Sequence, residues 1–363
     1  MTPTSNESAC CGPVYASPHD PRGCRLITER VFSHDVAVKA TRTRMKRSKG
    51  YDPEPLNVPP LFSKPSRPVE MVKWLITKYM WPQSSLWIAI AVVVFHVITP
   101  DVSRFESLGA GDVGLIWLRN VVLMTIVIGG QHWWLHIRKA QGTEYKYEQR
   151  WLAKDRKSFL FNDQTKDNMF FTLVSGGGIA ALYESIMLWL YANESIPQLR
   201  SLWAVALMTF AVFWIEGLHF YANHRLLHVD PLYKWAHALH HRNVNTGPWS
   251  GISMHPVEHL LYLSTPFVFL VIPGSPFIAT FCLVYLLLSP SPSHSGFDRF
   301  KVGEETLHGG DYFHNLHHRY FEVNYGMLLL PLDKWFGTFH DGSQEAHEQM
   351  KDRRRESAEV AGS

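Results

Sequence analysis

Histidine in this chain is concentrated in one stretch, where it recurs at helix-face spacing. Thirteen of the twenty histidines lie between His219 and His318. Most belong to three blocks: His224-Arg-Leu-Leu-His228, His237-Ala-Leu-His240-His241 and His314-Asn-Leu-His317-His318. Positions three and four apart share a helix face, so each block should aim two or three imidazole rings at one point. Eight such rings are too many for one tetrahedral ion. The pattern predicts two metal ions held almost wholly by histidine.

The histidine ligands restrict which metals are possible but do not identify one of them. Imidazole suits zinc, iron, copper and nickel, so the spacing alone leaves iron and zinc both open. A shell of neutral imidazoles leaves the ions strongly positive, which favours a redox-active iron pair that binds and reduces dioxygen. His255 and His294 would each add a ligand from a further segment. The spacing of His132 and His136 also fits one helix face, but as an isolated pair it is expected to occur by chance.

Long apolar runs predict an integral membrane protein. A membrane-spanning helix needs about twenty largely apolar residues. Four segments approach this length and pair into two hairpins: 86–99, 113–130, 169–191 and 202–218. A fifth run, 260–288, carries Pro273-Gly274 at its middle and predicts a short re-entrant hairpin. We therefore expect an all-α membrane bundle of about four spans with a histidine-rich helical cap.

Charge places this cap on the cytoplasmic side. The loop 138–157 is rich in Lys and Arg, which favour the cytoplasm. Four crossings return the chain to that face just before His224, so all three blocks share one side. Glu184 and Glu216 fall inside predicted spans. Their side chains are expected to face protein or a cavity and to serve mainly in packing. The net charge of +3 gives no reason to expect a nucleic-acid partner.

Three regions are predicted along the chain. Residues 1–70 form a polar, disordered tail, residues 71–345 the membrane-embedded domain, and residues 346–363 a charged tail.

The motifs together resemble the sterol desaturase / fatty acid hydroxylase superfamily of membrane di-iron enzymes. The resemblance runs from about residue 114 to 340 and rests on these elements: His224-Arg-x-x-His228, His237-x-x-His240-His241, His255-Pro-Val-Glu258, His294-Ser-Gly296, His314-x-x-His317-His318, Asn324-Tyr325-Gly326 and Asp333-x-x-Phe336-Gly337-Thr338. It implies iron ligands at His224, His228, His237, His240, His241, His294, His314, His317 and His318, with His255 less certain.

The resemblance also implies a reaction class. Such an enzyme uses dioxygen and two electrons to hydroxylate or desaturate a lipid C–H bond. The His-Pro-Val-Glu and His-Ser-Gly elements are closest to sterol-modifying members, of the C-5 sterol desaturase or methylsterol oxidase type. A fatty-acid or alkyl-lipid hydroxylase is the alternative. No haem motif of the His-Pro-Gly-Gly type is present, so electrons should come from a separate protein of the cytochrome b5, ferredoxin or reductase type.

Metal-bound histidines need acceptors that fix their orientation. The candidates are Glu258, Asp298, Asn324 and Asp333, together with Asp230, Asp311 and Asn315. The membrane would be the endoplasmic reticulum in a eukaryote and the inner membrane in a bacterium.

Two other classes compete. A zinc hydrolase could use His255-Pro-Val-Glu258-His259, which has the H-x-x-E-H form. A zinc hydrolase of this kind gives no role to the histidines of the three blocks. A non-enzymatic metal carrier would place its ligands inside the spans, whereas these blocks follow them.

Overall fold

The computed structural model describes residues 51–362 and divides the chain into two compact units. One unit is Thr41–Lys351. The other is Met1–Ala40 with Asp352–Ser363, of which only residues 352–362 are described, as the end of a helix. The first fifty residues of the predicted tail lie outside the described residues.

The described chain is mostly helical, as predicted. Its α-helices are α2 (Pro68–Trp74), α3 (Ser85–Val93), α4 (Ala110–His132), α5 (Gln164–Phe170), α6 (Gly177–Ala192), α7 (Leu202–Leu227), α8 (Ala238–His241), α9 (Pro256–Tyr262), α10 (Pro276–Leu288), α11 (Pro290–Ser293), α12 (Tyr312–Tyr320), α13 (Leu332–Trp335) and α14 (Gln344–Gly362). One antiparallel hairpin joins β1 (Arg299–Val302) to β2 (Glu305–His308), with Arg299 opposite His308.

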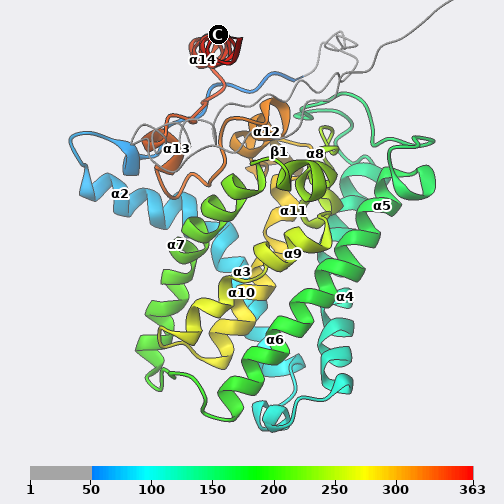
Figure 1. Ribbon diagram of the computed structural model, residues 1–363, viewed down its shortest axis with the longest axis vertical. Helices are drawn as coiled ribbons and strands as arrows, with labels where there is room; N and C mark the ends of the chain where they lie inside the picture. The colour runs from blue at the N-terminus through cyan, green and yellow to red at the C-terminus, as the bar shows by residue number, and fades with distance from the viewer. Residues whose placement is uncertain (1–50, 363) are drawn as a thin grey trace, which may run out of the picture. The chain divides into compact units, whose positions relative to one another are not determined.

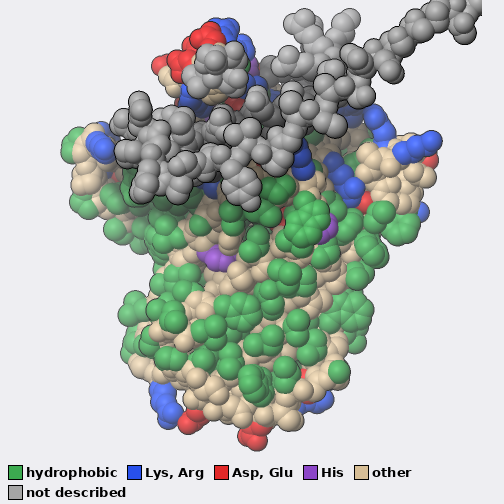
Figure 2. Space-filling view, viewed as in Figure 1, with side chains coloured by type: hydrophobic (Ala, Val, Ile, Leu, Met, Phe, Trp, Pro, Cys, Tyr) green, Lys and Arg blue, Asp and Glu red, His purple; other side chains and the backbone are tan. Residues whose placement is uncertain are grey.

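Five helical segments among residues 51–362 are long and apolar enough to cross a membrane. They are Pro68–Ile98, Ala110–Ile137, Gln164–Ala192, Leu202–Leu227 and Pro276–Ser293. The first four correspond to the predicted crossings, which confirms the helical membrane bundle. The first segment bends at Trp81, whose backbone is not helical. Figure 1 shows α2 lying across the end of the bundle and α3 running along it. In Figure 2, hydrophobic side chains cover the sides of these helices.

The predicted hairpin is present and is longer than expected. Its first arm contains helix α9, and its second arm is helix α10. The tip at Gly274 exchanges backbone hydrogen bonds with Pro197 and Leu199, in the loop between α6 and α7. The hairpin therefore reaches the end of the bundle opposite the histidines. The segment that contains helix α10 is the most buried of the five candidate spans. In this segment, Pro276–Ser293, 72% of the apolar window is buried, compared with 22–44% in the other four.

A buried polar network ties helix α10 to its neighbours. Arg119 of α4 pairs with Glu184 of α6, and Thr280 of α10 donates to the same carboxylate at 2.8 Å. Both carboxylate oxygens of Glu184 accept hydrogen bonds. This agrees with the packing role expected for Glu184.

Residues near both ends of the described chain have defined structure. Tyr51 donates to Asp298 at 2.8 Å, the amide of Leu56 donates to the Asp341 carbonyl, and Phe62 is buried. These contacts extend the folded unit to at least Tyr51. At the other end, the charged residues after 344 form helix α14.

Candidate metal centre

Nine of the ten predicted ligands converge in two clusters. His224, His228, His237, His241 and His317 form one, and His240, His294, His314 and His318 form the other. Within each cluster the candidate ligand nitrogens all lie within 4.8 Å of one another, and every ring is buried. The clusters are adjacent, since the ring centroids of His241 and His318 are 4.9 Å apart. We refer to them as the five-histidine and four-histidine clusters.

The fold brings these rings together from four segments at one end of the bundle (Figure 1). His224 and His228 lie at the end of α7, and His237 to His241 in the turns that form α8. His294 follows α11, and α12 carries the third block. Asp311 accepts a hydrogen bond from the backbone amide of His314 and so caps α12.

The structure corrects one detail of the predicted geometry. The spacing suggested that each block aims at a single point, but both His-x-x-His-His blocks divide between the clusters. The outer pair of one block, His237 and His241, joins the five-histidine cluster, and His240 joins the other. In the third block His314 and His318 pair, and His317 points the other way. These two blocks therefore bridge the two clusters, whereas His224 and His228 both belong to the five-histidine cluster.

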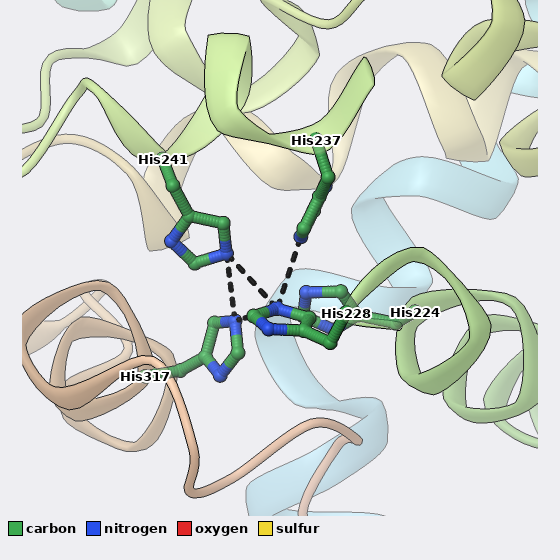
Figure 3. Close-up of side chains that lie close together, drawn as sticks. All are labelled: His224, His228, His237, His241 and His317. Atoms are coloured by element: carbon green, nitrogen blue, oxygen red, sulfur yellow. Dashed lines mark hydrogen bonds between the residues drawn. The ribbon is translucent and has the colours of Figure 1, made fainter. Parts of the chain in front are cut away.

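The inward-facing atoms are the Nε2 nitrogens (Figure 3). In the five-histidine cluster, Nε2 of His228 lies 3.1 Å from Nε2 of His237, His241 and His317. In the four-histidine cluster, the Nε2 atoms of His294, His314 and His318 form a triangle with sides of 3.1 Å. These nitrogens are close enough together that each cluster could hold a metal ion.

The outward-facing nitrogens show which ring atoms carry protons. Nδ1 of His224 lies 2.7 Å from the Tyr325 carbonyl, and Nδ1 of His317 lies 2.6 Å from the Val323 carbonyl. Nδ1 of His294 likewise faces the Pro290 carbonyl at 2.9 Å. A carbonyl has no proton to give, so each Nδ1 must donate and each Nε2 carries a bare lone pair. Lone pairs facing one another in a buried site repel, and a cation between them removes the repulsion. The donor set therefore fits metal ions.

Burial keeps these rings neutral, which metal binding requires. It lowers the pKa of His237 and His294 to about 3 and that of His240 to about 4. For His241 and His318, burial lowers the pKa well below 6.5, and the neighbouring histidines lower it further.

Two of the predicted orienting residues act on ligands. Oε1 of Glu258 lies 2.8 Å from Nδ1 of His237, and both side chains are buried. Asp333 acts through the backbone: it accepts from the amides of Tyr325 and Gly326 at 2.8 Å each, and the Tyr325 carbonyl faces His224. The sequence did not reveal the main-chain acceptors at Tyr325, Val323 and Pro290, although the Asn-Tyr-Gly motif contains the first of them.

Two further predicted orienting residues, Asn324 and Asp298, form hydrogen bonds with other parts of the fold instead. Asn324 bonds the backbone of Phe313 and His340. Asp298 accepts from the hydroxyls of Tyr51 and Tyr147. Neither contacts a cluster ring. Asp230 forms a partly exposed ion pair with Lys234.

The tenth predicted ligand, His255, lies outside both clusters, and the zinc hydrolase site is not assembled. Nδ1 of His255 accepts from the Val257 amide and caps α9. The two ring nitrogens of His259 form hydrogen bonds with the Ser175 hydroxyl and the Ile252 carbonyl. Glu258, the supposed general base, faces His237.

A cavity of about 370 Å³ joins the metal centre to the apolar part of the bundle. Its wall at one end includes His224, His237, His240, His294 and His314, from both clusters. Elsewhere apolar side chains of α2, α3, α7 and α10 and of the segment 327–329 share the wall with polar ones, which include Lys78, Gln83 and Asn223. This volume falls within the usual range for small-molecule pockets, which is roughly 300–1,000 Å³.

Comparison with known proteins agrees with the motifs. Residues 208–338 match the family model described as fatty acid hydroxylase. A Delta(7)-sterol-C5(6)-desaturase from Nicotiana tabacum is 28% identical over 157 residues, covering 40% of this chain and 51% of that protein. Methylsterol monooxygenase 1 of Gallus gallus is 30% identical over 155 residues, covering 41% and 50%. A Delta(7)-sterol 5(6)-desaturase of Gibberella zeae is 32% identical over 123 residues, covering 33% and 34%.

These matches confirm the resemblance: the matched segment belongs to the sterol desaturase / fatty acid hydroxylase superfamily. The chain spans about half the length, or less, of these curated relatives. No solved structure matches the chain.

Proposed function

We propose that this protein is a membrane-embedded di-iron oxidoreductase that uses dioxygen to hydroxylate or desaturate a C–H bond of a lipid. The observation that carries the proposal is the pair of adjacent clusters of buried histidines, in which Nε2 atoms of neighbouring rings lie 3.1 Å apart. Two iron ions bound there would activate dioxygen for attack on an unactivated C–H bond. The nine cluster histidines would be the ligands.

The protein's own residues prepare this site. The backbone carbonyls of Tyr325, Val323 and Pro290 hold three rings with Nε2 inward, and Glu258 holds a fourth. Histidine-lined walls that continue into apolar helices keep bulk water from the reacting atoms. Because that cavity extends between the spans, its substrate should come from the bilayer.

A sterol-like lipid is the proposed substrate class. The names of the relatives from Nicotiana tabacum and Gallus gallus, a sterol desaturase and a methylsterol monooxygenase, support it. A fatty-acid or alkyl-lipid hydroxylase is the alternative, and the family model's description supports that one. The site would face the cytoplasm, where a separate electron carrier supplies reducing equivalents.

The test is lipid profiling of cells that express the wild-type chain or a His317→Ala variant. The proposal predicts a lipid that gains one oxygen atom, or loses two hydrogen atoms, only with the wild-type chain and only in air. Labelled dioxygen should place its label in a hydroxylated product. An unchanged lipid profile in cells with verified iron-loaded protein would contradict the proposal.

A further inference from the structure

The two carboxylates buried in membrane-spanning helices differ in how they are satisfied. Glu184 has both oxygens engaged by Arg119 and Thr280. Glu216 of α7 is only 3% exposed, and among residues 51–362 its single hydrogen bond comes from Thr265, to Oε2 at 2.7 Å. No cation pairs with it at close range, since its nearest basic ring nitrogen is Nδ1 of His219 at 3.9 Å. Its Oε1 therefore lacks a protein partner.

That free oxygen belongs to the cavity of the metal centre. Glu216 lines the same cavity as the cluster histidines, together with Tyr79 and Tyr285. A carboxylate inside a membrane span is costly unless something satisfies it, and such residues usually serve a ligand. Polar groups placed among the apolar side chains of a pocket fix the orientation of the bound molecule.

The helix sets the distance between this carboxylate and the metal centre. Glu216 and His224 are eight residues apart on α7, which corresponds to about 12 Å along the axis. Phe220 lies between them on the cavity wall, with its ring centroid 4.9 Å from that of His224. A lipid can therefore place a polar group at Glu216 while its carbon skeleton passes Phe220 to the histidines.

We propose that Glu216 is the anchor for a hydroxyl group of the lipid. A hydroxyl donates the hydrogen bond that Oε1 lacks. The inference rests on the proposed function for the identity of the cavity as a substrate site, and it adds the chemical group that is recognised.

The test is binding to the full-length protein in detergent micelles without oxygen, so that turnover is not required. The probes are 5α-cholestanol and 5α-cholestane, which differ in one hydroxyl, and the alkyl pair octadecanol and octadecane, which differ in the same way. Wild type should bind the alcohol about tenfold or more tightly than the matched hydrocarbon in at least one set. The set that binds distinguishes a sterol from an alkyl lipid. Equal binding within both sets overturns the proposal.

Substitutions locate the effect. Glu216→Leu should bring the ratio of alcohol to hydrocarbon affinity to about one. Glu216→Gln keeps a side-chain oxygen that can accept a hydrogen bond, so it should retain the preference for the alcohol. Thr209→Val, two turns earlier on α7 and outside the cavity lining, is the matched control and should keep the wild-type ratio.

Metal content separates the two proposals. Iron bound per chain should be the same in wild type and all three variants. A folded Glu216→Leu protein that still prefers the alcohol, or a folded Glu216→Gln protein that has lost this preference, overturns the anchor. Selective binding by a protein that holds no iron contradicts the proposed function and leaves the anchor standing.

Discussion

Nδ1 of His237 lies 2.8 Å from Oε1 of Glu258, and neither side chain is exposed. Burial raises the pKa of Glu258 to about 7. The second oxygen of this carboxylate has no hydrogen-bond partner. A negative charge here is costly in isolation and becomes favourable beside bound cations. The pair therefore links the charge of a buried acid to the metal load of the five-histidine cluster.

Replacing Glu258 with Ala should weaken metal binding. The imidazole of His237 loses its proton acceptor, and losses of this kind typically reduce metal affinity about 10–100-fold. The measurement is iron per chain after dialysis against graded chelator. Glu258→Gln keeps an acceptor without the charge and should fall between Ala and wild type. Wild-type retention in the Ala variant would show that His237 needs no orienting partner.

Removing one ligand from either cluster should abolish turnover. His317→Ala affects the five-histidine cluster and His240→Ala the four-histidine cluster, so each should lower the iron content from two ions toward one or none. His132→Ala is the control, because His132 stacks on His136 and belongs to neither cluster. It should keep its metal and activity. A dead His132→Ala protein, or an active His317→Ala protein, would mean that the ligand set is wrong.

Substitution of Gly296 should disturb the four-histidine cluster. Gly296 has φ of +85°, and a Cβ atom there would meet the Thr246 carbonyl at 2.7 Å. Because His294 lies two residues earlier, Gly296→Ala should both destabilise the protein, by about 1–3 kcal/mol, and release iron.

Gly303 is the matched control for that change. It also has a positive φ, of +64°, but a Cβ atom there meets nothing within 4 Å. Gly303→Ala should cost some stability and leave the iron content intact. Equal iron loss in both variants would point to general unfolding.

The metal-free protein should lose stability as the pH falls from about 7 toward 4. Burial lowers the pKa of His237 and His294 to about 3, and of His240 and His259 to about 4, whereas in the unfolded chain these groups titrate near 6.5. Between those values the unfolded chain binds more protons, so acid favours unfolding. Burial raises the pKa of Glu258 to about 7, which acts in the opposite direction, but the histidines outnumber it.

Thermal unfolding of the chelated protein at several pH values checks this linkage. The midpoint should fall steadily below pH 6.5. A midpoint that is constant or rises with acid would indicate that the histidines are not buried as neutral rings.

The sequence was informative wherever local spacing determines geometry. The paired spacing of His224 with His228 and of His314 with His318 identified helix faces, and long apolar runs identified the spans. It did not reveal how each His-x-x-His-His block divides between two clusters, because that depends on how α8 and α12 face one another. Nor could it identify the main-chain acceptors at Val323 and Pro290, since every residue carries a carbonyl.

Glu184 and Glu216 show the same limit. Both are single carboxylates in apolar runs, and the sequence assigned both to packing. Arg119 on α4 forms an ion pair with Glu184. Among residues 51–362, no Lys or Arg forms an ion pair with Glu216. That difference arises from helix packing across the bundle, which no local pattern encodes.

The most direct test of the central claim is the metal content of the full-length protein, purified in detergent from cells supplied with both iron and zinc. Two iron ions per chain, coupled as a pair in the Mössbauer spectrum, is the predicted result. A chain that holds one zinc ion, or no metal, while its fold is intact would contradict the account.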